Sequence, residues 1–194
     1  MASVVPFAED YLALPIATVW RKRSVWLACL FIAELFTFTA LAHFEDEFAK
    51  IVALSLFVPL CISTGGNSGS QAATLITRAM ALGQIGPRDW LRVLRHELIM
   101  GIVLGLTLGA IGFLRAALTP ASVLGGADRW LLSLVIAQAV AAICMWGTLV
   151  GSLLPMIFRR LGFDPGYASS PFVATFVDVT GIIIYFTIAK IYLL

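Results

Sequence analysis

Charged residues are scarce in this sequence. Of its 194 residues, 12% are charged and 60% are hydrophobic, whereas a soluble domain carries about 25% charged residues. Such a chain has too little polar surface to cover a core in water. The scarcity of charge therefore excludes a soluble domain, a disordered chain and a nucleic-acid-binding module, and it indicates a membrane protein with several spans.

Cysteine and histidine are also rare. The cysteines stand singly in apolar stretches, at Cys29, Cys61 and Cys144, which excludes a disulfide framework and a zinc site with paired ligands. The histidines, His43 and His96, lie at the ends of apolar segments. We therefore expect no resident cofactor, and we interpret the cysteines as core thiols.

Long apolar runs are what the sequence has in quantity. Each run can cross a hydrocarbon layer of about 30 Å as a helix, and none shows the alternation typical of barrel strands. We therefore predict an all-α membrane protein with five transmembrane helices. The predicted spans are residues 24–42, 48–82, 97–118, 130–158 and 171–191.

Basic residues are divided unevenly between the two sides that these spans define. Nine of the 13 fall on the side of the N-terminus, which the positive-inside rule places in the cytoplasm, with the C-terminus outside. These nine are Arg21, Lys22, Arg23, Arg78, Arg88, Arg92, Arg95, Arg159 and Arg160. Residues 1–23 are predicted to form a cytoplasmic segment with a short interfacial helix that is interrupted at Pro15.

The second span contains a polar interruption. As a straight helix, residues 48–82 would reach roughly 50 Å, so this span must tilt or bend. Its middle, from Ser63 to Gln71, consists only of small or polar residues. Irregular or weakened helix at membrane depth persists only where it is buried in protein or lines a wet cavity. We interpret the run as the lining of a pathway; the alternative is a close helix–helix contact through small residues.

An acidic residue interrupts the fifth span. Asp178 lies about 10 Å along the helix from Pro171, a depth at which an ionisable group indicates a functional site. Ala174, Asp178, Gly181 and Tyr185 follow Pro171 at steps of three and four, so they share one helix face. This face suits the close approach of a second helix or of water. The alternative is an aspartate neutralised by an arginine of another span, but no arginine or lysine lies at mid-span.

Three glycines at a spacing of four mark the third span. Gly101, Gly105 and Gly109 lie on one face of the predicted helix. Such a series is typical of a small-residue face that allows another helix to approach closely. We interpret it as a packing face.

Two separated regions resemble the MgtE family of magnesium transporters. Residues 59–71, which read Pro-Leu-Cys-Ile-Ser-Thr-Gly-Gly-Asn-Ser-Gly-Ser-Gln and precede a basic loop, resemble the second transmembrane helix of that family. The other region resembles the family's connection between helices four and five and its pore helix. It consists of residues 154–155, 159–165, 170–175 and 178–181. The match covers about residues 20–194.

The resemblance implies a fold, an activity and an assembly. It implies a homodimer in which helices two and five of both protomers surround a central path for Mg²⁺ and other divalent cations. Residues 24–194 would form the five-helix cation-transport domain, in a bacterial inner (plasma) membrane. Many members also carry a cytoplasmic N-terminal domain and paired CBS domains. We expect this chain to be a transmembrane-only member, related to the animal magnesium solute carriers.

The resemblance also implies a metal site. The family's pore aspartate falls on Asp178, and a two-fold axis would place two such carboxylates on one ion. Mg²⁺ prefers oxygen ligands and retains its water, so the Ala174 carbonyl and the polar backbone around Gly66, Asn67 and Gly69 are further expected acceptors.

Two alternatives rest on other residues. Glu34, at the middle of the first span, could couple a sodium ion or a proton in a Mg²⁺ exporter, or it could accept a hydrogen bond from Thr37 or Thr107. Gly66-Asn67-Ser68-Gly69 fits the Gly-x-Ser-Gly pattern of intramembrane serine proteases, with Ser68 as the nucleophile. That chemistry needs a histidine base within hydrogen-bond reach, and both histidines are predicted at span ends. We therefore expect a transporter and not an enzyme.

Overall fold

The fold is a bundle of long helices. The computed structural model describes residues 12, 14–45 and 52–193. Their elements are α1 (Ile16–His43), α3 (Val52–Ala81), η2 (Pro87–Asp89), α4 (Trp90–Ala117), α5 (Ala121–Leu124), α6 (Arg129–Arg160), η3 (Pro165–Tyr167) and α7 (Ser170–Leu193). The five long helices, α1, α3, α4, α6 and α7, are long and apolar enough to cross a membrane. The predicted all-α fold with five membrane spans is confirmed.

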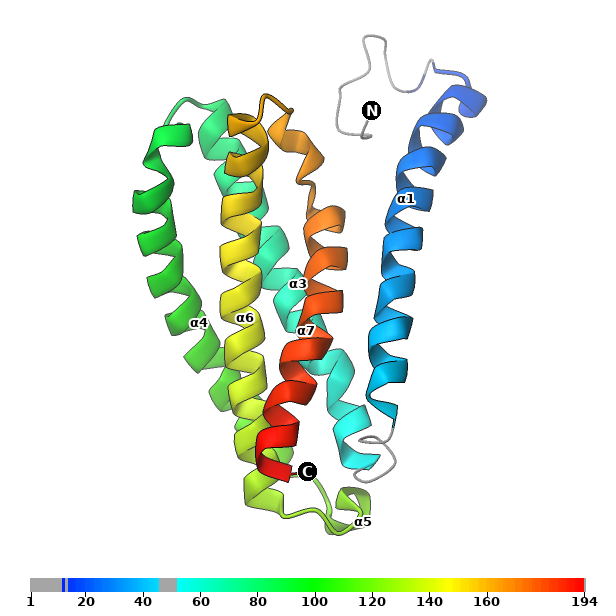
Figure 1. Cartoon of the computed structure of the whole chain (residues 1–194), viewed down its shortest axis with the longest axis vertical. Coiled ribbons are helices and arrows are strands. Elements are labelled where there is room, and N and C mark those ends of the chain that lie inside the picture. Colours follow the sequence, from blue (N-terminus) through cyan, green and yellow to red (C-terminus); the bar gives the residue numbers. More distant parts are fainter. Residues whose placement is uncertain (1–11, 13, 46–51, 194) are drawn as a thin grey trace.

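Helix α6 lies at the centre of the bundle. It packs against α3, α4 and α7, while α1 stands at the side of the bundle and contacts α7 (Figure 1). The largest hydrophobic cluster joins α3, α6 and α7 through side chains such as Leu54, Ile136 and Phe186. This packing sets how α3 and α7 face each other.

The first span begins earlier than predicted. Pro15 is the N-cap of α1, so helix runs from Ile16 without a break into the apolar segment. Proline is tolerated at a helix start because the first N–H groups have no intrahelical partner. Pro15 therefore starts a helix and does not interrupt one. The rest of the predicted interfacial helix falls mainly on residues 1–11 and 13, which lie outside the described residues.

The polar run of the second span is regular helix. The expectation of irregular or weakened helix there is wrong, because α3 continues through residues 63–71. Thr64 and Ser68 donate to carbonyl oxygens of their own helix, at 2.8 Å from Leu60 O and 3.1 Å from Gly65 O. The predicted tilt is present instead: α3 crosses obliquely behind α6 and α7 (Figure 1).

Glycines allow α3 and α6 to cross closely. A Cβ atom added to Gly147 would overlap the carbonyl oxygen of Gly65, and one added to Gly151 would overlap that of Gly69. The predicted alternative for the polar run, a small-residue contact, is therefore confirmed for this part of α3. These contacts also support the helix that the glycines would otherwise weaken.

The glycine series of α4 faces α6. A Cβ atom on Gly105 would lie 2.8 Å from Ala141 O, and one on Gly109 would lie 2.7 Å from Ala137 O. Side chains at these positions would keep the two helices apart. The predicted packing face is confirmed.

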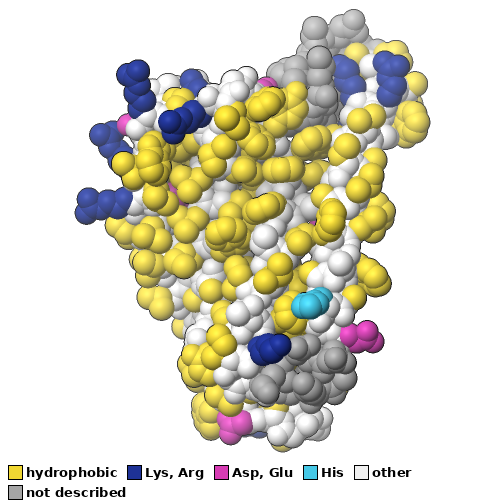
Figure 2. Space-filling view, viewed as in Figure 1, with side chains coloured by type: hydrophobic (Ala, Val, Ile, Leu, Met, Phe, Trp, Pro, Cys, Tyr) yellow, Lys and Arg dark blue, Asp and Glu magenta, His cyan; other side chains and the backbone are white. Residues whose placement is uncertain are grey.

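Basic residues gather at one end of the bundle. The nine that the sequence assigned to one side lie in the first two turns of α1 and α4, in η2, and in the last turns of α3 and α6. Figure 2 shows Lys and Arg side chains in dark blue around that end. Arg115, Arg129 and Lys190 lie near the opposite ends of α4, α6 and α7, while Lys50 is outside the described residues.

Candidate functional site

Asp178 lies where α7 passes α3. Its Oδ1 atom is 3.0 Å from the position that a Cβ atom on Gly66 would take, and the Ala174 Cβ is 3.6 Å from the same position. The carboxylate thus occupies the space left by the missing side chain of Gly66. The structure therefore brings together three of the five predicted ligand residues, from two helices.

The Asp178 carboxylate has an unsatisfied oxygen. Its Oδ1 atom is buried and has no hydrogen-bond partner within the described part of the chain. The ion pairs among those residues, Arg92–Asp89 and His96–Glu97, lie elsewhere. The predicted alternative, neutralisation by an arginine of another span, is therefore wrong for the described residues. A buried oxygen in this state is costly unless a ligand, water or another chain satisfies it.

Hydrogen bonds fasten α7 to α3 on both sides of Asp178. Ser70 Oγ donates to Ser170 O at 3.1 Å, and the hydroxyls of Thr74 and Ser170 are 3.1 Å apart. Farther along α7, the Tyr185 hydroxyl donates to Leu54 O at 2.7 Å. These bonds set the register that places Asp178 beside Gly66. Sequence reasoning missed this role, although the hydroxyl residues of the polar run were visible.

Asn67 points away from the rest of its own chain. It is exposed, and its Nδ2 atom donates to Ser63 Oγ at 3.3 Å. Ser63, Asn67, Gln71 and Thr74 are all exposed and follow one another at steps of four and three. They form one polar helix face, which we call the α3 polar face. It is next to, but not the same as, the glycine face that packs on α6.

Gly69 does not lie beside Asp178. A Cβ atom on Gly69 would lie 2.9 Å from both Gly147 O and Val173 Cγ1. Its carbonyl oxygen faces Gly151 of α6. The structure therefore places this predicted ligand residue in the contact between α3 and α6.

Glu34 lies on the side of α1 that faces the bundle. The Thr37 hydroxyl donates to Glu34 Oε1 at 3.0 Å, which confirms one of the two predicted hydrogen bonds. The other predicted donor, Thr107, instead donates to Val103 O. Helix α1 packs against α7, and both Glu34 and Asp178 are partly buried. The two mid-span acids therefore lie on neighbouring helices.

The described residues of a single chain do not provide a complete set of acidic, histidine or cysteine ligands for a metal ion. No group of three such residues occurs within the described ranges. Complete coordination of a cation at Asp178 would therefore use backbone oxygens, water or a second chain. Mg²⁺ suits this arrangement because it is bound through few carboxylates and keeps several waters.

Ser68 has no catalytic base in the described structure. Its buried Oγ atom is 3.1 Å from Gly65 O and 3.1 Å from Cys144 O. Both are backbone acceptors, so the hydroxyl ties α3 to α6. His96 bonds to its neighbour Glu97 at the basic end of the bundle, and His43 is at the far end of α1. This geometry contradicts the protease alternative.

Comparisons with known proteins find one family of relatives for this chain. The sequence model of the MgtE family, described as "Divalent cation transporter", matches residues 58–188, more than half of the chain. The chain is 39% identical over 183 residues to a protein of Thermus thermophilus named "Magnesium transporter MgtE", covering 92% of this chain and 38% of that protein. Proteins with the same name from Enterococcus faecalis and Bacillus subtilis are 32% and 28% identical, each over 89% of this chain. The chain spans less than two fifths of the length of these curated relatives.

Proposed function

Because the chain belongs to the MgtE family of divalent cation transporters, we propose that it conducts Mg²⁺ and other divalent cations across a membrane. Family membership supports a transporter and not an enzyme, as the sequence predicts. The observation on which the proposal rests is the buried, unpartnered Oδ1 atom of Asp178 beside Gly66. A cation is the ligand that this oxygen lacks.

Asp178 is the proposed cation site in each chain. The Ala174 carbonyl, one turn earlier on α7, and the backbone at Gly66 are the further protein ligands that we propose. Asn67 lies next to Gly66 on the side that leads out of the chain. Water completes the octahedral shell, because Mg²⁺ loses its hydration reluctantly. Gly69 belongs to the contact with α6 and is not a ligand in this proposal.

A homodimer completes the path. The α3 polar face is exposed in one chain, and lipid cannot satisfy its amide and hydroxyl groups. Pairing with a second copy about a two-fold axis would enclose this face and bring two Asp178 carboxylates to one ion. Helices α3 and α7 of both chains would then line the path.

The distribution of basic residues supports an orientation in the membrane. The basic end of the bundle holds nine arginines and lysines, and such residues are retained in the cytoplasm. We place the N-terminus in the cytoplasm and the C-terminus outside, in a bacterial inner membrane.

Flux of Mg²⁺ into liposomes tests the proposal. Asn67→Leu places an apolar side chain on the α3 polar face and should block flux with little loss of folded protein, because Asn67 is exposed. Ser68→Ala is the matched control on the next residue and should retain flux. Flux at the wild-type level in Asn67→Leu would place the path elsewhere.

A second mechanism has a specific observation in its favour. Glu34 is partly buried on α1, the helix that packs against α7, so a proton or sodium ion on Glu34 would change the field at the cation site. The protein would then be a coupled Mg²⁺ exporter. Liposomes in which voltage, pH and sodium gradients are varied one at a time separate the two mechanisms: a channel follows voltage alone, whereas an exporter depends on sodium or protons.

A further inference from the structure

A cavity lies at the basic end of the bundle, away from Asp178. Its volume is about 340 Å³, and it is lined by Pro87, Arg88, Trp90 and Arg160. Arg88 belongs to η2, and Arg160 is the last residue of α6. The cavity exists because η2 packs against α6, which brings two arginines from distant parts of the sequence to one place. Its volume is within the range of small-ligand sites, about 300–1,000 Å³.

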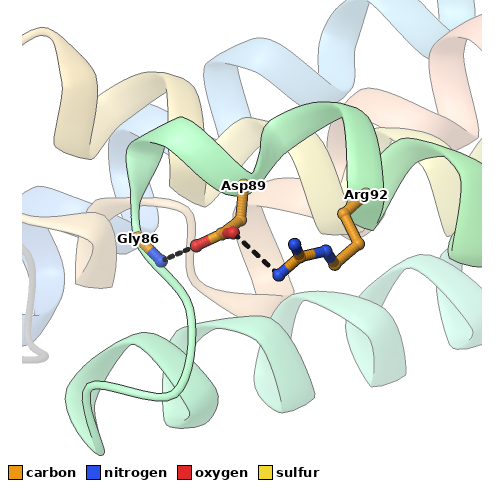
Figure 3. A network of polar contacts seen from close by, with 3 residues as sticks. All are labelled: Gly86, Asp89 and Arg92. Atoms are coloured by element: carbon orange, nitrogen blue, oxygen red, sulfur yellow. Dashed lines mark hydrogen bonds and ion pairs between the residues drawn. The ribbon is translucent and has the colours of Figure 1, made fainter.

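Both arginines are free to bind an anion. Within the described residues, neither guanidinium has an ion pair or a hydrogen bond. Asp89, the neighbouring acid, is engaged elsewhere. It accepts from the Gly86 N–H at 2.9 Å and from Arg92 Nη1 at 3.2 Å (Figure 3). The carboxylate thus shapes the loop and leaves the positive charge of the cavity uncompensated.

The surroundings of the cavity favour a lipid. Trp90 is 42% exposed, and tryptophan concentrates at membrane interfaces, where its ring reaches the headgroup level. Ile157, one turn before Arg160 on α6, is also exposed, as is Leu91 beside Trp90. An amphiphile could therefore place its anionic group between the arginines and its chains along these apolar side chains.

We infer that the cavity between Arg88 and Arg160 binds the phosphate headgroup of an anionic phospholipid. Guanidinium groups recognise phosphate oxygens through paired N–H donors, and basic pockets between transmembrane helices on the cytoplasmic side suit such headgroups. The site would hold the loop from α3 to α4 and the end of α6 against the membrane surface. It is independent of the cation path.

The test measures phosphatidylglycerol binding to the whole chain in phosphatidylcholine nanodiscs, by native mass spectrometry and by thermal unfolding. Increasing the phosphatidylglycerol fraction should stabilise the wild-type protein. Arg88→Gln and Arg160→Gln should each weaken this binding about fivefold, and the double variant about twenty-five-fold. Both side chains are exposed, so unfolding in phosphatidylcholine alone should be unchanged.

Arg95→Gln is the matched control. It removes the same charge from an exposed position of α4 that does not line the cavity, and it should change binding less than twofold. An equal loss in Arg95→Gln would show general surface attraction and overturn the site. A second arm titrates inorganic phosphate into nanodiscs of phosphatidylcholine alone. Stabilisation by phosphate that matches the effect of phosphatidylglycerol would identify a free-anion site and overturn the lipid assignment.

Discussion

Asp178 and Gly66 form a complementary pair at the scale of single residues. The carboxylate oxygen approaches α3 at Gly66, one of three positions where α3 has no side chain. A buried carboxylate interacts with a cation far more strongly than one in bulk water does. The pair therefore explains how a single acid in each chain can hold an ion between two helices.

Substitution of Asp178 tests this residue directly. Asp178→Asn keeps the size of the side chain but removes its charge, so Mg²⁺ binding should weaken at least tenfold, about 1.4 kcal/mol. Titration with Mg²⁺ by calorimetry, or protection from thermal unfolding, measures the change. Glu34→Gln is the control: it should affect binding less and mainly alter any sodium or proton dependence. Wild-type binding and flux in Asp178→Asn, together with the loss of both in Glu34→Gln, would show that the ion site is on α1.

Gly66→Ala tests the role of the missing side chain. The new Cβ atom would lie 3.0 Å from Asp178 Oδ1, so the carboxylate must move away from α3. The other near atoms belong to Ala174, at 3.6 Å or more, so the fold should be retained. Mg²⁺ should protect the variant from thermal unfolding less than it protects the wild type. In the absence of Mg²⁺, the variant should unfold at a temperature close to that of the wild type. If Mg²⁺ protects the variant as well as it protects the wild type, ion binding does not depend on the position of the Asp178 carboxylate beside α3.

At the scale of elements, the crossing of α3 and α6 depends on glycines. Gly147→Ala and Gly151→Ala would each direct a Cβ atom into backbone carbonyls of α3, and backbone cannot move aside as a side-chain end can. We expect destabilisation of about 1–3 kcal/mol or more for each variant, measured by thermal unfolding in detergent.

Gly112 of α4 provides the matched control for the glycines of the crossing. A Cβ atom on Gly112 of α4 would lie 3.4 Å from side-chain atoms of Ile136 and Val140, which is ordinary contact. Gly112→Ala should therefore be tolerated, with gain of helix propensity. If it destabilises the protein as much as Gly151→Ala does, the close crossing is not what makes the α6 glycines necessary.

At the scale of the whole molecule, the exposed α3 polar face favours pairing with a second copy of the chain. We expect the protein to purify as a homodimer. A thiol at Gln71, introduced by Gln71→Cys in a Cys29→Ala background, should be joined to its counterpart by a bifunctional maleimide. Cys61 and Cys144 are buried and should not react.

Leu106→Cys is the control for the dimer. Leu106 is 66% exposed on α4, away from the α3 polar face, and should not give the cross-linked species. A protein that remains monomeric in lipid nanodiscs and still transports Mg²⁺ would contradict the two-fold path.

The sequence by itself determined the class of the molecule. Hydropathy is a local property, so the five spans could be identified from single segments of the chain. Asp178 could likewise be singled out because a charge deep in an apolar helix is costly wherever its neighbours lie. The division of basic residues between two sides also required only their order along the chain.

Only the tertiary structure decided how the polar run is used. Its residues are all helical, and the rotation of α3 directs Gly65 and Gly69 to α6, Gly66 to Asp178, and Asn67 outward. Adjacent residues of a helix point in different directions, about 100° apart, so their partners depend on the tilt and rotation that packing imposes. Likewise, Arg88 and Arg160 share a cavity only because η2 folds against the end of α6, which no local pattern of either segment encodes.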